Sequence, residues 1–134
     1  MSNETEKLTI NLGVVELAQI DVLAEQGIYS NRSDFIRTAI RKQLENYKEK
    51  IEQSFSSFPK KDNTIVTIGI MKVSKKMLEK YTKENDKVNI HVIGMLIIAS
   101  DITPELFINA IENIDIKGKL IASEEIMSVF DNYC

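Results

Sequence analysis

The feature that most constrains this chain is a single amphipathic strand near its start, with no second strand nearby to pair with it. Polar and apolar residues alternate strictly from Lys7 to Leu12, and successive side chains of a strand point to opposite faces. A strand with bare edges is unstable by itself, and even an isolated two-stranded ribbon is marginal unless helices cover it. We therefore expect the pairing partner of this strand to come from another chain.

Two helices are predicted after this strand. Apolar residues recur at helical spacing from Val14 to Gln26, and Gly27 stands where a left-handed residue ends many helices. A second helix begins after Asn31, whose side chain can cap it, and Asp34 can reach back in a variant of the capping box. Its apolar stripe continues from Phe35 to Ile51, which predicts a long amphipathic helix.

Two copies related by a two-fold axis would complete this unit. Their strands would pair antiparallel over a core built by four helices, and the dimer would be obligate. The residues predicted to form this shared core are Leu8, Ile10, Leu12, Leu17, Ile20, Phe35, Ile36 and Ile40. The paired strands would then carry a doubled polar face formed by Lys7, Thr9 and Asn11.

This doubled polar face has the size and chemistry of a DNA reader. A ribbon of six residues is about 20 Å long at roughly 3.3 Å per residue, and it fits a major groove roughly 12 Å wide. Lysine can donate to guanine, asparagine can pair bidentately with adenine, and threonine offers a hydroxyl and a methyl group. Double-stranded DNA is the predicted partner. An amphipathic strand is also typical of any half-exposed sheet edge, so the prediction depends on the helices that follow.

Three segments in this order carry a resemblance to a known family: the strand Lys7–Leu12, the segment Gly27–Arg37 and the residues Ala39–Arg41. The chain from Lys7 to Tyr47 resembles the CopG-like ribbon-helix-helix regulators. The resemblance implies an α+β unit of one strand and two helices that forms an intertwined homodimer. It also implies that the outward strand residues read DNA bases.

The start of the second helix is the predicted phosphate contact. In the family this helix start donates backbone amides to phosphate, which here would involve Ser30, Asn31 and Arg32. Free amides and the helix dipole attract anions on general grounds as well, although Ser30 and Asn31 also compete as helix caps. The net charge of −3 is a mild argument against a nucleic-acid partner. Residues 28–50, however, hold six basic residues against three acidic ones.

A connector at residues 54–63 is predicted to separate a DNA-binding domain at 1–53 from a second domain at 64–134. Three segments of the second domain each run from a glycine through an apolar strand to a serine, at residues 67–74, 92–100 and 116–123. Helix-like stretches follow them at residues 75–82, 104–114 and 124–133. Two interpretations remain open: a leucine-rich-repeat-like stack with parallel strands in register, or an ordinary small α/β domain of about three β-α units.

Residue counts argue against several classes of function. His91 and Cys134 are the only histidine and cysteine, and no phosphate loop or catalytic triad has a recognisable frame, so we predict no metal, no cofactor and no enzyme activity. The longest apolar stretch, Val88–Ala99, is far shorter than the roughly 20 residues of a membrane span. No signal peptide is predicted, because Met1–Thr9 is polar and acidic. The chain is predicted to be cytoplasmic.

The leading functional prediction is a transcriptional repressor that reads the major groove as a homodimer. We expect residues 64–134 either to join dimers into tetramers or longer arrays, or to form a pocket for a small effector. Two alternatives share the DNA-binding half: an antitoxin that holds a toxin through its C-terminal half, and an adaptor in plasmid copy control or segregation. Antitoxin tails are commonly disordered until bound, whereas this half has the composition of a folded domain.

Overall fold

The computed structural model describes residues 5–55 and 63–131. The chain divides into two units, Met1–Ser57 and Phe58–Cys134. The described residues contain six α-helices and a three-stranded parallel sheet, so the protein is mixed α and β. The connector predicted at residues 54–63 lies mostly outside the described residues, which omit 56–62.

The described part of the first unit contains three helices and no strand in a single chain. These are α1 (Val14–Glu25), α2 (Arg32–Asn46) and α3 (Lys48–Gln53). The predicted helices after Val14 and Asn31 are confirmed, but the expected continuous helix to Ile51 is wrong. Tyr47 has φ −108° and ψ 14°, which lies outside the helical range and separates α2 from α3.

Local signals explain how α1 ends and α2 begins. The amides of Gly27 and Ile28 donate to the carbonyls of Ala24 and Leu23 at 3.0 and 3.1 Å, and Gly27 has φ 78°. This is a Schellman motif, and glycine adopts its left-handed conformation without steric cost. Asn31 is the cap of α2, and its side chain accepts from the amide of Asp34 at 2.9 Å.

The second unit alternates strands and helices. Its elements are β1 (Thr64–Val73), α4 (Lys75–Lys83), β2 (Val88–Ile98), α5 (Pro104–Ala110), β3 (Ile111–Ile121) and α6 (Glu124–Phe130). The strands are parallel in the order β1-β2-β3. This confirms the predicted small α/β unit of three β-α pairs, and its sheet is parallel. The leucine-rich-repeat-like interpretation stays a prediction. The helix expected to continue to residue 114 is wrong, because β3 already begins at Ile111 and α5 ends one residue before it.

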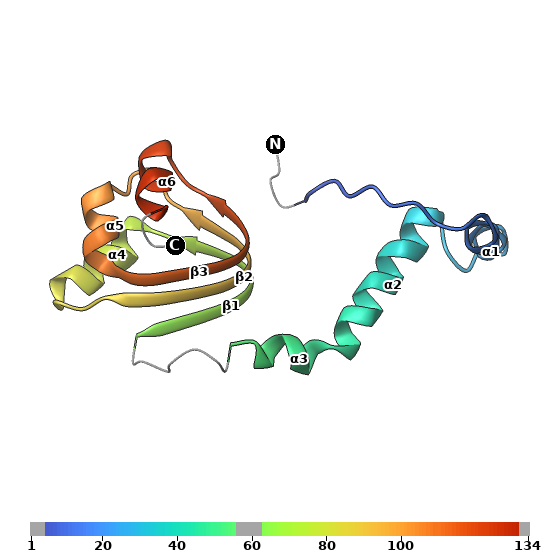
Figure 1. Cartoon of the computed structure of the whole chain (residues 1–134), viewed down its shortest axis with the longest axis horizontal. Coiled ribbons are helices and arrows are strands. Elements are labelled where there is room, and N and C mark those ends of the chain that lie inside the picture. Colours follow the sequence, from blue (N-terminus) through green and yellow to red (C-terminus); the bar gives the residue numbers. More distant parts are fainter. Residues whose placement is uncertain (1–4, 56–62, 132–134) are drawn as a thin grey trace. The chain divides into compact units, whose positions relative to one another are not determined.

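Each strand bends along its length so that its end turns back toward its start, and the three helices lie along the open side of the bend (Figure 1). The core fills the space enclosed in this way. It contains Leu78, Phe107 and Ile126 from the helices, together with Ile90 and Leu96 from β2, and all five side chains are fully buried. Serine or threonine caps each helix through its side-chain oxygen: Ser74, Thr103 and Ser123.

A column of three glycines runs across the sheet. Gly69 lies opposite Gly94, and Gly94 lies opposite Gly118. Their φ angles of 132°, 137° and 138° are rarely adopted by residues with side chains. A Cβ atom at Gly94 would collide with the carbonyl oxygen of Gly69, and one at Gly118 would collide with that of Gly94. Gly94 and Gly118 therefore require glycine for two reasons and Gly69 for its φ angle alone. The column lies inside the strands instead of near their starts as the sequence segments suggested.

Candidate nucleic-acid interface

The segment that leads into α1 holds the three residues predicted to read bases. Lys7, Thr9 and Asn11 are exposed in the single chain. The alternate side chains are also largely uncovered, since Leu8 is 79% exposed and Ile10 is 54% exposed. An apolar face left open in this way is a hallmark of a surface that meets another protein.

Of the remaining residues of the predicted dimer core, Leu12 lies just before α1 and the others lie on α1 and α2. Of the eight, Ile20 is the single buried residue, and four are half-buried: Leu12, Leu17, Phe35 and Ile36. Ile40 is 50% exposed, and so to a similar degree are Leu44 further along α2 and Tyr47 just after its end. A hollow of about 240 Å³ opens between the two helices, lined by Glu16, Gln19, Ile20, Leu23 and Phe35. The first unit therefore presents an apolar surface that its own described residues do not cover.

The start of α2 is a network of hydrogen bonds. The carboxylate of Asp34 accepts from the amide of Ser30 at 3.0 Å, while the side chain of Asn31 accepts from the amide of Asp34. The expected return bond to the cap residue is thus made one residue earlier, to Ser30. The cap satisfies the amide of Asp34. The first-turn amides of a helix that no cap satisfies are the groups that can bind an anion.

The guanidinium of Arg32 is held by a carboxylate on α1. Its Nε and Nη2 atoms donate to Asp21 at 2.8 and 2.9 Å, which is a bidentate ion pair that joins α1 to α2. The hydrogen bond from Arg32 holds the pKa of Asp21 below its usual value, and the same bond raises the pKa of Arg32. Helical periodicity gave no sign of this pair, because its two residues are 11 positions apart on different helices.

A comparison of the sequence with known protein families identifies the family of this chain. A family model described as the ribbon-helix-helix transcriptional regulator family matches residues 3–127. The chain belongs to this family. The match takes in the second unit as well as the first, whereas the resemblance seen in the sequence covered Lys7 to Tyr47 only. No curated protein and no solved structure matches the chain.

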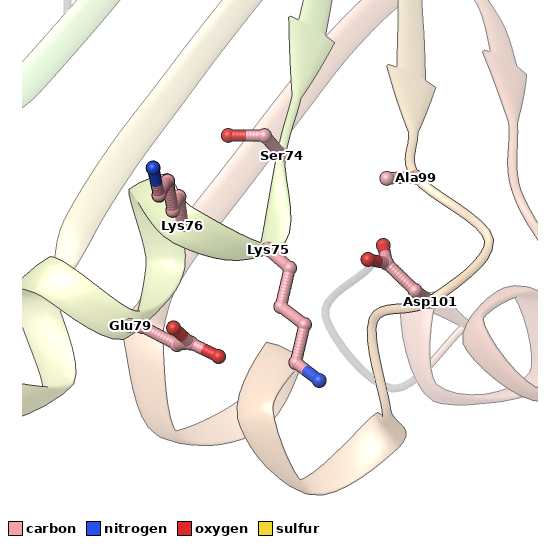
Figure 2. A pocket seen from close by; sticks show the side chains of 6 residues that line it. All are labelled: Ser74, Lys75, Lys76, Glu79, Ala99 and Asp101. Atoms are coloured by element: carbon pink, nitrogen blue, oxygen red, sulfur yellow. The ribbon is translucent and has the colours of Figure 1, made fainter.

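A hollow lies on the described part of the second unit of this ribbon-helix-helix regulator, where a small effector was expected. It measures about 390 Å³ and is lined by Ser74, Lys75, Lys76, Glu79, Ala99 and Asp101. The side chains of Lys75 and Lys76 point in different directions, and the carboxylates of Glu79 and Asp101 lie on opposite sides (Figure 2). All four charged side chains are exposed. The hollow is therefore open, and its charged groups do not converge on one point.

His91 lies inside the sheet of the regulator and not in that hollow. It is a buried residue of β2, and its Nδ1 atom is 4.0 Å from a carboxylate oxygen of Asp115 on β3. The described residues contain no cluster of three or more histidine, cysteine or acidic side chains that could hold a metal ion. None of the described helices is long and apolar enough to cross a membrane.

Proposed function

We propose that this ribbon-helix-helix protein is a sequence-specific DNA-binding transcriptional repressor that acts as an intertwined homodimer. The observation that carries the proposal is the segment before α1, in which Leu8 and Ile10 are exposed on alternate positions with Lys7, Thr9 and Asn11. Membership in a family of ribbon-helix-helix transcriptional regulators supports the same function.

Dimerisation through this segment accounts for its exposed apolar side chains. Two copies that pair their segments antiparallel would cover Leu8 and Ile10 with the uncovered surfaces of α1 and α2. Burial of one such side chain contributes about 1.5–3 kcal/mol, and a two-fold axis counts each contribution twice. Pairing would also satisfy the backbone groups of residues 5–13, which form no ladder in the single chain.

The opposite face of the paired segments would lie in the major groove. Lys7 suits guanine, Asn11 suits adenine, and Thr9 suits either a hydrogen-bonding edge or a thymine methyl group. A two-fold dimer predicts an inverted-repeat operator, and occupancy of that operator would block the polymerase.

The start of α2 would position the dimer on the DNA backbone. Of the proposed contacts Ser30, Asn31 and Arg32, the hydrogen bonds favour the backbone amide of Arg32, since the Ser30 amide and the Arg32 guanidinium already have carboxylate partners. A phosphate there would also benefit from the basic excess of residues 28–50.

The second unit favours a regulator over an antitoxin. An antitoxin of the usual kind has a tail that folds on its toxin. Here the sheet and its helices enclose a core of their own, with Phe107, Leu78 and Ile126 fully buried. An adaptor in plasmid maintenance would use the same DNA-binding face, so its test is genetic and not structural.

Enrichment of duplexes from a random library tests the proposal. We would compare the wild-type protein with a variant carrying Lys7→Ala, Thr9→Ala and Asn11→Ala. A matched control carries Lys87→Ala, Thr82→Ala and Asn109→Ala, which alter the same residue types at exposed positions of the second unit. Sedimentation would first establish that all three proteins form dimers.

We expect the wild type and the control to enrich one short inverted repeat, and the first variant to enrich nothing. Binding should weaken steeply with added salt, because phosphate contacts release counterions. Failure of the wild-type protein to enrich any sequence would overturn sequence-specific DNA binding.

A further inference from the structure

The two free edges of the parallel sheet carry different side chains. Beside β1, no further strand lies among the residues that the structure describes. Three apolar side chains of β1 are about half exposed there: Val66 at 48%, Ile68 at 53% and Ile70 at 47%. At the register positions of β3 that correspond to them stand Asp115, Lys117 and Lys119. One edge is therefore apolar and the other is charged.

The three glycines of the column differ in whether a neighbouring carbonyl oxygen lies against them. Gly94 and Gly118 each receive the carbonyl oxygen of the glycine on the preceding strand, in the space where a Cβ atom would stand. Gly69 has nearly the same φ angle, yet nothing lies within 4 Å of its missing Cβ atom. By the same register, the carbonyl of Gly118 faces outward from β3. The β3 edge thus presents a glycine carbonyl group, and the β1 edge has beside Gly69 the open space that such a carbonyl would occupy.

The helices at the two ends carry opposite charges. Helix α4 has four lysines and one glutamate, whereas α6 has two glutamates and no basic residue. Within the chain α4 packs against α5, and α5 packs against α6. A continued stack would place α6 of one copy beside α4 of the next, where opposite charges attract. Pairing of two β1 edges would instead bring two lysine-rich helices together.

We propose that the second unit stacks head to tail with that of another copy of the chain. The β3 edge of one copy lies parallel to the β1 edge of the next, with Gly118 opposite Gly69. In this register Lys117 lies beside Ile68 and Lys119 beside Ile70. The chain already contains such neighbours, because Lys117 lies opposite Ile93 and Lys119 opposite Met95. The lysine stems cover the apolar side chains while their ammonium groups reach water.

Head-to-tail contacts do not close through a two-fold axis; they form a ring where the rotation between copies closes and an open array where it does not. Each homodimer formed by the first units carries two second units, and each of these has a free β1 edge and a free β3 edge. Stacking therefore links dimers into longer assemblies. This inference goes beyond the proposed function and does not depend on DNA reading.

Sedimentation velocity of the full chain over a range of concentrations tests the stacking. The first variant is Ile68→Lys, which puts a lysine beside Lys117 of the next copy. Its matched control is Ile108→Lys on α5, because the two isoleucines are 53% and 46% exposed. The second variant, Glu124→Lys with Glu125→Lys, reverses the charge of α6. The third combines this reversal with Lys76→Glu and Lys80→Glu on α4.

We expect the wild type and Ile108→Lys to form species larger than a dimer as concentration rises. Ile68→Lys and the α6 reversal should lose these species, and the combined reversal should regain them. Circular dichroism would establish that each variant keeps its helices and sheet. Assembly should also weaken with salt, because the helix charges are exposed.

Three results would overturn the proposal: a wild type that never exceeds a dimer, an α6 reversal that assembles like the wild type, or a combined reversal that does not regain assembly. An α6 reversal that assembles like the wild type, together with loss of assembly in Ile68→Lys, would indicate that two β1 edges pair with each other. A failure of the first-unit dimer is distinguishable, because Ile68→Lys would then sediment as a monomer.

Discussion

The two units of this chain differ in how far their apolar side chains are buried within a single chain. All nine of the largest fully buried side chains belong to the second unit, from Val73 to Ile126. In the described part of the first unit, Ile20 is the single buried apolar residue, while Leu8 and Ile10 lie open. The second unit therefore owes its core to one chain, whereas the proposed core of the first unit needs a second chain. We expect the two units to respond differently to dilution and to mutation.

The largest effect should come from a charge placed on the apolar face of the first unit. Ile10→Asp would leave a carboxylate in the proposed dimer core of both copies, where burial of an unpaired charge is prohibitive. We expect the dimer to weaken at least about a thousandfold, while the sheet of the second unit remains folded. Sedimentation and thermal melting at several concentrations would measure this.

Thr9→Asp is the control for this charge, because it alters the neighbouring position on the opposite face of the same segment. It should keep the dimer and lose DNA binding. Equal loss of the dimer in both variants would contradict the assignment of the two faces.

Replacement of a glycine of the column by alanine should lower the stability of the second unit and leave that of the first unit unchanged. Gly94→Ala adds a Cβ atom that collides with the Gly69 carbonyl and also strains a φ angle of 137°. Gly69→Ala meets the same strain at 132° with open space around it. Backbone strain alone costs about 1–3 kcal/mol, and the collision adds to it. Chemical denaturation should show Gly94→Ala as the more destabilised of the two, and equal losses would mean that the column has no steric role.

The smallest effect concerns the ion pair that joins α1 to α2. Because the hydrogen bond from Arg32 lowers the pKa of Asp21, the pair stabilises the folded state above the ordinary aspartate pKa. This contribution is lost as the pH falls through the lowered value. Asp21→Asn should therefore melt slightly below the wild type at neutral pH and equally with it in strong acid.

The difference should be slight because both side chains of the pair are exposed to solvent. Glu25→Gln removes a carboxylate from the same helix and serves as the control. A difference between Asp21→Asn and the wild type that persists at the lowest pH would show that the pair is not its source.

Local chemistry made part of the fold predictable. The Asn31 cap, the Gly27 helix end and the parallel register of the three strands all follow from signals that lie within a few residues or recur at a fixed period. The boundary between α5 and β3 was missed because the isoleucines around Ile111 suit either a helix or a buried strand.

Features that depend on distant partners were not predictable in the same way. The positive φ of Gly94 matters because a carbonyl from β1 lies against it, and the ion pair of Asp21 with Arg32 joins two helices. For the candidate interface, the alternation from Lys7 to Leu12 predicts one face that reads bases and one that pairs with a second chain. Both faces and the pairing remain predictions, since the partner strand would come from another copy.

The glycine column also governs how this fold can change in length. A one-residue insertion in β2 before Gly94 would move a residue with a side chain into the place of Gly94 and turn every later side chain of the strand to the opposite face. Duplication of a whole segment of 24 or 25 residues would keep each glycine beside the next. Insertions or deletions of a whole glycine-to-glycine segment would therefore keep the glycines aligned across the sheet, whereas changes of any other length would not.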